Sequence, residues 1–164
     1  MLQLGVNSLM ETRQLAGRLA GIIEDYPDGL DIALIGELGT GKTTLVRFLA
    51  QALQVEEPVS SPSFVLQHEY HCAGGRILEH WDLYRLRRLP DELVEPPALN
   101  SVRVVEWADR VASFVESCKL TIKLSFMGGD PTSSRRLVAI DGARYLTCDL
   151  GEKLKKESKR GAGS

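Results

Sequence analysis

The pattern of apolar residues in the first third of the chain predicts a helix, then a strand, and then a second helix. From Ser8, one helical face collects Thr12, Leu15, Ala16, Leu19, Ile22 and Ile23, and Ser8 with Glu11 forms a capping-box pattern. The continuous apolar run 32–35 predicts a strand buried on both faces, as in a parallel sheet. A glycine-rich loop follows, and helical spacing returns over residues 45–53.

Further along the chain the pattern changes to the two-residue alternation of strands. Residues 64–70 alternate, and Gly74-Gly75 separates them from residues 76–82, so a hairpin is expected there. Residues 89–100 contain three prolines and little periodicity, which predicts a loop, and the apolar run 102–106 predicts another inner strand. Residues 120–126 alternate as well, and two shorter strands are expected at 137–140 and 145–150. These last strands are expected to form an antiparallel flank.

The chain length favours a single domain. A typical domain has about 150 residues, and the chain has 164, so we expect one domain over residues 1–150. Residues 151–164 carry five basic and two acidic side chains and almost nothing apolar. Such a segment cannot offset its ordering entropy by burial, so we expect a mobile basic tail.

Composition narrows the class of protein further. Hydrophobic residues make up 43% and charged residues 26%, which is typical of a globular protein with a real core. The net charge of −2 gives no overall attraction to nucleic acid. Cys72, Cys118 and Cys148 are odd in number and form no Cys-x-x-Cys pair, which favours reduced thiols and a cytoplasmic location. Because no signal-peptide pattern and no apolar run of about 18 residues occurs, neither secretion nor a membrane span is expected.

The glycine-rich loop carries the strongest chemical signal. Residues 36–43 match the pattern G-x-x-x-x-G-K-[ST] between the predicted strand and the predicted helix, the context that this phosphate-binding loop (P-loop) requires. Its glycines let backbone amides face an anion, the helix N-terminus adds partial positive charge, Lys42 can reach the outer phosphates and Thr43 can ligate Mg²⁺. The expected nucleotide contacts are Gly36, Glu37, Leu38, Gly39, Thr40, Gly41, Lys42, Thr43 and Thr44. With the later strands, the motif predicts an α/β, P-loop NTPase-like three-layer fold whose mixed sheet has a parallel core and an antiparallel flank.

A P-loop needs acidic side chains at the ends of neighbouring strands, because Mg²⁺ must be held and the attacking water oriented. Asp82 ends one predicted strand and Glu106 ends another. Both are expected to converge at the carboxyl ends of the strands, where open α/β sheets bind ligands.

Four motifs in this order identify a family resemblance. The P-loop is followed by Ser61-Pro62-Ser63-Phe64, by the segment 80–86 (His-Trp-Asp-Leu-Tyr-Arg-Leu) and by Glu106-Trp107. In these elements the chain resembles the bacterial TsaE (YjeE) ATPases. The P-loop alone is widespread, but its combination with Ser-Pro-x-Phe and Asp-Leu-Tyr-Arg is distinctive.

The resemblance implies an ATPase that binds ATP and Mg²⁺ and works with two larger partners, TsaB and TsaD, in making threonylcarbamoyladenosine next to the anticodon of tRNA. Contact with tRNA would be indirect, through that complex. The resemblance also implies that Thr43 and Glu106 share the Mg²⁺, that Asp82 lies by the γ-phosphate and is needed for hydrolysis, and that Lys42 takes part in catalysis.

Other positions follow the family pattern less closely. The segment 61–64 resembles the family's switch-like loop, with Ser63 in place of the usual threonine. Thr12 matches a threonine that lies near the nucleotide in relatives, although it also fits the apolar helix face. Many relatives carry Gly-Arg before the penultimate strands, and here either Arg135 or Arg136 could substitute. Arg85, beside Tyr84, is a candidate for contact with a partner.

Three other functions also use a P-loop and are alternatives to an ATPase. A P-loop small-molecule kinase would transfer phosphate to a metabolite instead of water, but the proline-rich segment after Arg88 suits an ordered helical lid poorly. A GTPase would be expected to carry Asn-Lys-x-Asp and Asp-x-x-Gly, and neither string occurs. A nucleotide-gated assembly factor with incidental hydrolysis cannot be separated from an ATPase by sequence.

Overall fold

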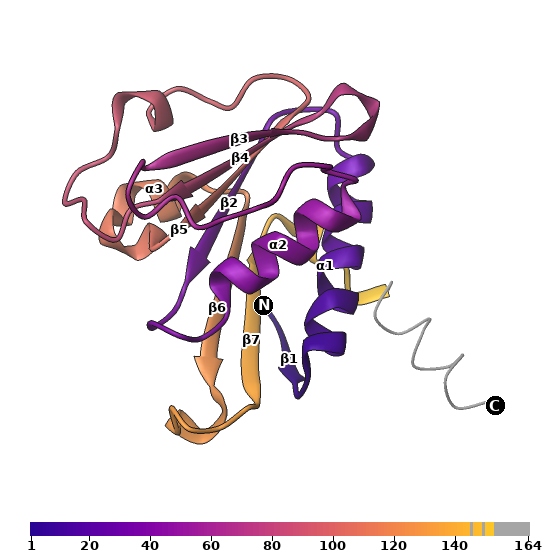
Figure 1. The fold of residues 1–164 in the computed structure, drawn as a ribbon, viewed down its shortest axis with the longest axis vertical. Helices are drawn as coiled ribbons and strands as arrows, with labels where there is room; N and C mark the ends of the chain where they lie inside the picture. Colours follow the sequence, from indigo (N-terminus) through magenta and orange to yellow (C-terminus); the bar gives the residue numbers. More distant parts are fainter. Residues whose placement is uncertain (145, 149, 153–164) are drawn as a thin grey trace.

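The computed structural model describes residues 1–144, 146–148 and 150–152, and within them a seven-stranded mixed sheet forms the centre of the molecule (Figure 1). The strand order is β1-β7-β6-β2-β5-β4-β3. The strands are β1 (Leu2–Val6), β2 (Leu30–Ile35), β3 (Gln67–His71), β4 (Ile77–Asp82), β5 (Ser101–Glu106), β6 (Leu120–Phe126) and β7 (Arg136–Gly142). The four central strands β6, β2, β5 and β4 are parallel, whereas β3 on one side and β7 and β1 on the other pair antiparallel. The predicted α/β fold with a parallel core is therefore confirmed, with antiparallel strands at both edges.

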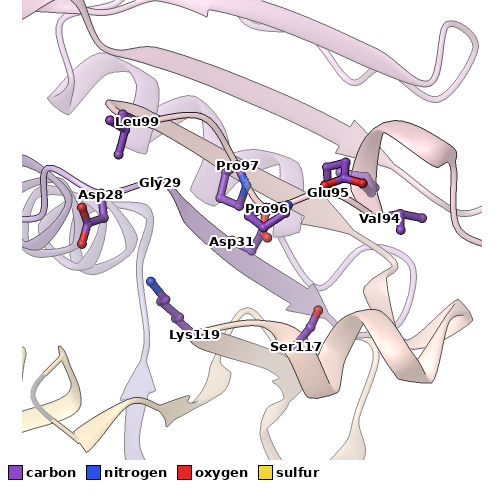
Figure 2. Close-up of a pocket in the computed structure, with 11 residues that line it drawn as sticks. Asp28, Gly29, Asp31, Val94, Glu95, Pro96, Pro97, Leu99, Ser117 and Lys119 are labelled. Carbon is purple, nitrogen blue, oxygen red and sulfur yellow. The ribbon is translucent and has the colours of Figure 1, made fainter.

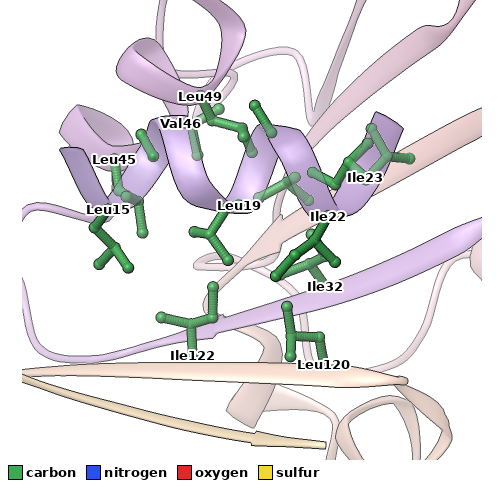
Figure 3. Packing of buried hydrophobic residues seen from close by; sticks show 14 of the residues in the cluster. Leu15, Leu19, Ile22, Ile23, Ile32, Leu45, Val46, Leu49, Leu120 and Ile122 are labelled. Carbon is green, nitrogen blue, oxygen red and sulfur yellow. The ribbon is translucent and has the colours of Figure 1, made fainter. Parts of the chain in front are cut away.

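Helices α1 (Leu9–Glu24) and α2 (Lys42–Ala52) lie side by side against one face of the sheet (Figure 1). Figure 3 shows how Leu15 and Leu19 from α1 and Leu45 from α2 pack above Ile32 and Ile122 of the sheet. Helical spacing directs these side chains to one face, and their removal from water is the main stabilising contribution.

The opposite face of the sheet is covered by the segment 83–100 and by α3 (Ala112–Ser117), which makes the third layer. Trp81, Val105 and Phe114 are central to this second cluster. Every residue of β5 is buried, as expected for a strand between two layers. The connections also contain short 3-10 turns at η1 (Ala73–Gly75), η2 (Asp91–Leu93), η3 (Ala108–Arg110) and η4 (Met127–Gly129).

Arg103 of β5 fastens the segment 83–100 to the sheet. Its guanidinium donates to Asp31 through Nε at 2.7 Å and Nη2 at 2.8 Å, and to the backbone carbonyls of Glu92 and Glu95, each at 2.8 Å. The Arg103 side chain is 4% exposed. One buried cation thus satisfies a carboxylate and two carbonyls that would otherwise lack partners.

One predicted strand is wrong, and one strand of the sheet was not predicted. Residues 145–150 were expected to form a strand, but the described residues there (144, 146–148 and 150–152) are helical, with Leu146 and Leu150 buried in the core. The edge of β7 that such a strand would occupy is taken by β1, which pairs antiparallel with it. The sequence analysis did not predict β1.

The other element predictions are confirmed with small shifts. Ser8 caps α1, since its Oγ accepts from the backbone N–H of Glu11 at 3.2 Å. The hairpin of β3 and β4 begins only at Gln67, and Phe64 lies in a turn before it, 86% exposed. The prediction of a mobile tail over 151–164 is wrong at its start, because Gly151 and Glu152 are helical, and it stays a prediction for residues 153–164, which lie outside the described residues. None of the helices formed by the described residues has the length and apolar character that a membrane crossing requires.

Candidate functional site

The glycine-rich loop joins the carboxyl end of β2 to the start of α2 and has a backbone that requires glycine. Gly36 has a φ of 150°, and a Cβ there would lie 2.3 Å from the carbonyl oxygen of Leu124 on β6. Gly41, at a φ of 102°, occupies the N-cap of α2. A side chain at either position would be strained. The loop thus opens α2 with its first amides free of side-chain caps, an arrangement that suits an anion.

Lys42 is the first residue of α2 and is only 4% exposed. Its Nζ donates to the carbonyls of Gly36 at 2.7 Å and Glu37 at 3.0 Å, and it lies 3.7 Å from the centre of the Trp107 ring. Burial lowers the pKa of Lys42, and the negative charges of Glu106, Asp109 and Asp82 act in the opposite direction. The ammonium is therefore a desolvated cation placed inside the loop.

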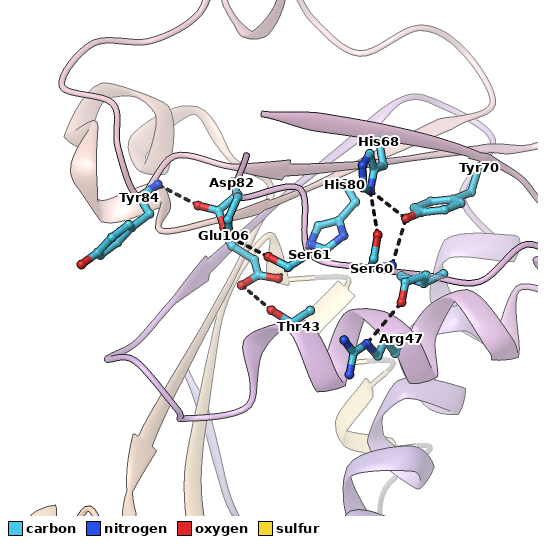
Figure 4. Close-up of polar contacts among 12 residues, drawn as sticks. Thr43, Arg47, Ser60, Ser61, His68, Tyr70, His80, Asp82, Tyr84 and Glu106 are labelled. Atoms are coloured by element: carbon cyan, nitrogen blue, oxygen red, sulfur yellow. Dashed lines mark hydrogen bonds and ion pairs between the residues drawn. The ribbon is translucent and has the colours of Figure 1, made fainter. Parts of the chain in front are cut away.

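Glu106, at the end of β5, is held through both carboxylate oxygens (Figure 4). Oε2 accepts from Thr43 Oγ1 at 3.0 Å, and Oε1 lies 2.8 Å from His80 Nε2. Glu106 is 2% exposed, and His80 is fully buried. A hydroxyl from α2 and a carboxylate from β5 therefore meet at the mouth of the loop.

Asp82, at the end of β4, lies opposite Glu106 in the parallel register of β4 and β5. Its Oδ2 accepts from Ser63 Oγ at 2.6 Å, and its Oδ1 accepts from the backbone N–H of Tyr84 at 2.8 Å. Ser61 Oγ lies a further 2.7 Å from Ser63 Oγ. The segment 61–64 thus reaches the site through Ser63.

These groups surround one cavity of about 280 Å³. Its lining consists of Leu38, Gly39, Gly41, Lys42, Thr43, Thr44, Ser61, Ser63, Asp82, Glu106 and Trp107. The structure thus brings together most of the site residues expected from the sequence. Gly36, Glu37 and Thr40 instead shape the loop, because the carbonyls of the first two accept hydrogen bonds from Lys42 Nζ and Thr40 Oγ1 donates to the Glu37 carbonyl at 2.8 Å.

Thr12 lies in a second cavity, of about 320 Å³, on the other side of the loop. It shares this cavity with Gly39, Gly41, Thr44 and Arg136, and its own Oγ1 donates to the Ser8 carbonyl at 3.1 Å. The two cavities have Gly39, Gly41 and Thr44 in common, so they are adjacent.

Arg136, rather than Arg135, reaches the loop. Its Nε donates to the carbonyl of Thr40 at 3.1 Å and its Nη2 to that of Gly39 at 3.2 Å, and the guanidinium stacks 4.5 Å from the Phe126 ring. Arg135 is exposed. The sequence left this choice open, and contact with the loop favours Arg136.

Aromatic and basic side chains form the rim beside Asp82. Tyr84 and Trp107 pack with ring centres 4.8 Å apart, and Arg110 lies 5.3 Å from the Tyr84 ring centre. The guanidinium of Arg85 lies 4.9 Å from the ring of the exposed Phe64. We call Phe64, Val65, Tyr84 and Arg85 the rim patch.

A larger cavity, of about 490 Å³, lies where β2 and β6 begin, at the amino ends of the parallel strands (Figure 2). Asp28, Asp31, Glu95 and Lys119 are among its polar residues. Asp31 is already paired with Arg103. Because open α/β sheets bind ligands at the carboxyl ends of their strands, the smaller cavity at the glycine-rich loop is the better candidate site.

Sequence reasoning missed His80 as part of the site. Its signal was the alternation of β4, which puts His80 on the same face as Asp82, two residues later. The contact with Glu106 could not be read from sequence, because it depends on the register of β4 against β5.

The fold and the site have the arrangement of the P-loop class of α/β proteins, with a strand, a glycine-rich loop, a helix and acids on neighbouring strands. A family model described as "Threonylcarbamoyl adenosine biosynthesis protein TsaE" matches residues 6–136. The chain therefore belongs to the TsaE family, and its role lies in the biosynthesis of threonylcarbamoyladenosine in tRNA.

Individual relatives agree with this membership. The chain is 34% identical over 145 residues to the TsaE protein of Streptomyces coelicolor, covering 84% of this chain and 96% of that protein. It is 39% identical over 101 residues to TsaE of Treponema pallidum, covering 59% of this chain and 73% of that protein. The crystal structure of Bacillus subtilis YdiB superimposes with a TM-score of 0.67 at 24% identity over 95% of each chain, which shows that the fold is shared.

Proposed function

We propose that this chain binds Mg-ATP at the glycine-rich loop and hydrolyses it in support of the TsaB–TsaD machinery that makes threonylcarbamoyladenosine next to the anticodon of tRNA. One observation carries the proposal: Thr43, Glu106, Asp82 and Lys42 converge on a single cavity at the start of α2. An oxygen-ligand pair, a second carboxylate and a buried cation are the groups that phosphoryl transfer to water requires.

The donor set fits Mg²⁺. This ion prefers oxygen ligands and keeps several waters, so one hydroxyl and one carboxylate from the protein suffice. Thr43 Oγ1 and Glu106 Oε2 are 3.0 Å apart and both face the cavity. When bound, the metal would neutralise charge on the phosphates, and these two side chains would hold it.

Lys42 and the amides of the loop are suited to binding the phosphates. The ammonium is held by backbone carbonyls and an aromatic face, without a direct carboxylate partner among the described residues. A phosphate chain offers it stronger, charge-assisted hydrogen bonds. The adjacent cavity with Thr12 and Arg136 is large enough to receive the nucleoside part.

Asp82 is suited to orienting the attacking water. Its Oδ1 is fixed by the Tyr84 amide, whereas the one described donor to its Oδ2 is the hydroxyl of Ser63, in the segment before β3. Rotation of Ser63 toward phosphate or metal would release Oδ2 to accept a hydrogen bond from water. The side chains of Asp82 and Ser63 thus prepare hydrolysis together.

Titration calorimetry with ATP in the presence of Mg²⁺ tests the proposal. Lys42→Ala removes charge-assisted hydrogen bonds worth about 1.5–3 kcal/mol, so affinity should fall about 10-fold to 100-fold. Lys123→Ala, which removes an exposed ammonium on β6, is the matched control and should bind normally. Unchanged affinity in a folded Lys42→Ala variant would refute ATP binding at this loop. A small-molecule kinase would differ in needing an acceptor other than water for phosphate release.

A further inference from the structure

We infer that His80 is a positioning residue that orients Glu106 for the cation. The inference rests on the proposed function and gives a role in the site to His80, the first residue of the motif 80–86. It is carried by one contact and by the burial around it: His80 Nε2 lies 2.8 Å from Glu106 Oε1, with His80 fully buried and Glu106 2% exposed.

The direction of the hydrogen bond follows from the acceptor. A carboxylate oxygen can only accept, so Nε2 carries the proton and donates it. The other ring nitrogen, Nδ1, is buried and has no hydrogen-bond partner among the described residues. The geometry therefore requires a hydrogen on Nε2 of His80.

The unpartnered Nδ1 argues against a purely structural role. An unpartnered buried polar atom costs about 1–3 kcal/mol, and a leucine would fill the same space without that cost. What the imidazole adds over an apolar side chain is its donation to Glu106. The position of His80 on β4, facing the helix side of the sheet with Asp82, allows that donation.

Glu106 needs this donor because its two oxygens have separate tasks. Oε2 faces Thr43, and these two oxygens are the proposed metal ligands. Thr43 would turn its lone pairs to a cation and no longer donate to Glu106. His80 would then be the one remaining side-chain donor to Glu106 among the described residues, and it fixes the carboxylate with Oε2 toward the cavity. Partners of metal ligands in such positions commonly change metal affinity by about 10-fold to 100-fold when removed.

Two amide substitutions of His80 separate its donation to Glu106 from the size and polarity of its side chain. In His80→Gln the amide nitrogen can reach the place of Nε2, whereas in His80→Asn it reaches only the place of Nδ1. His68→Asn is the matched control, because His68 faces His80 across the hairpin but bonds to Tyr70 and not to Glu106.

The measurement is the ATP dissociation constant with Mg²⁺ and with a chelator, taken as a ratio for each variant. We expect His80→Asn to lose about tenfold or more of the Mg²⁺ enhancement, with metal-free affinity unchanged, and we expect the same of Glu106→Gln. His80→Gln and His68→Asn should keep the enhancement. A parallel loss of affinity with and without Mg²⁺ in His80→Asn, or full enhancement in that variant, would overturn the assignment of His80.

A second readout uses the protein without nucleotide or metal. Nitrogen NMR of the His80 imidazole should show a hydrogen on Nε2, and an Nε2 without hydrogen would overturn the inference. The proposed function fails separately, because it predicts a Mg²⁺ enhancement in the unsubstituted protein. Absence of that enhancement would reject the metal site as a whole, and His80 with it.

Discussion

Asp82 and Glu106 are cross-strand neighbours whose hydrogen-bond partners assign them different tasks. Glu106 is bound to Thr43 and His80 and lies on the side of the proposed Mg²⁺ site, whereas Asp82 is bound to Ser63 and the Tyr84 amide. Two acidic residues at the same end of adjacent strands thus differ in the donors that their oxygens accept from. Sequence alone predicted both acids at the strand ends but could not supply these partners.

The separation predicts the behaviour of Asp82→Ala. Binding of Mg-ATP should stay within about threefold, because Asp82 lies outside the Thr43–Glu106 pair, and turnover should fall about tenfold or more because the water loses its orienting carboxylate. Calorimetry and phosphate release check the two halves. Glu79→Ala, which removes a carboxylate from the opposite face of β4, is the control. Full turnover in Asp82→Ala would exclude the assigned role.

At the scale of elements, α1 and α2 could be predicted because their apolar side chains keep the helical period over several turns, and β2 and β5 because each contains a mostly continuous apolar run. The elements that were not predicted are short or lie at the edge of the sheet. α3 has only six residues. β1 has five residues, of which only Val6 is buried, so its pattern is short. At residues 145–150, Leu146 and Leu150 fit both the alternation of a strand and the four-residue spacing of a helix, and the occupied edge of β7 decides for the helix.

The reactivity of Cys148 tests whether the segment around it is a helix, as in the structure, or a strand, as expected from the sequence. In a strand Cys148 would share the buried face of Leu146 and Leu150, whereas in the helix it is exposed. Burial raises the pKa of Cys72 to about 11 and that of Cys118 to about 12. Near pH 8, a soluble alkylating agent should therefore modify Cys148 at least about tenfold faster than either of the others. Equal rates in denaturant are the control, and a protected Cys148 would contradict the helix.

Arg103 holds the segment 83–100 against the sheet, so its substitution should lower the free energy of unfolding. Arg103→Met would leave the Asp31 carboxylate and the carbonyls of Glu92 and Glu95 without their donor. Breaking a buried pair on one side typically destabilises by about 3–5 kcal/mol, and the urea midpoint should fall accordingly. Arg88→Met, an exposed arginine in the same segment, should change stability by less than about 0.5 kcal/mol. Equal urea midpoints for the two variants would show that the contacts of Arg103 do not stabilise the protein.

At the scale of the whole molecule, the site is open on the side of the rim patch. Phe64 is 86% exposed and Val65 61%, and Arg85 lies over the Phe64 ring. Exposed aromatic and basic groups next to the candidate site suit a surface that a partner covers. We expect docking of TsaB and TsaD there to turn Ser63 from Asp82 toward phosphate or metal and to exclude bulk water, so that hydrolysis is coupled to assembly.

Charge reversal at Arg85 tests this coupling. Arg85 has no hydrogen bond to the nucleotide cavity and does not line it, so Arg85→Glu should lower the partner-stimulated rate of phosphate release more than the basal rate. Arg88→Glu, an exposed arginine of the same segment, is the control and should leave both rates largely unchanged. Equal loss of both rates in Arg85→Glu would put Arg85 in the nucleotide site instead, and no loss would remove it from the partner surface.

Release of phosphate from Mg-ATP tests the central claim most directly, measured with the protein alone and after addition of both TsaB and TsaD. We predict slow, Mg²⁺-dependent release by the chain alone, a higher rate with both partners, and loss of both rates in Asp82→Ala. Release that never exceeds the Asp82→Ala background, with or without the partners, would contradict the claim that this chain is an ATPase.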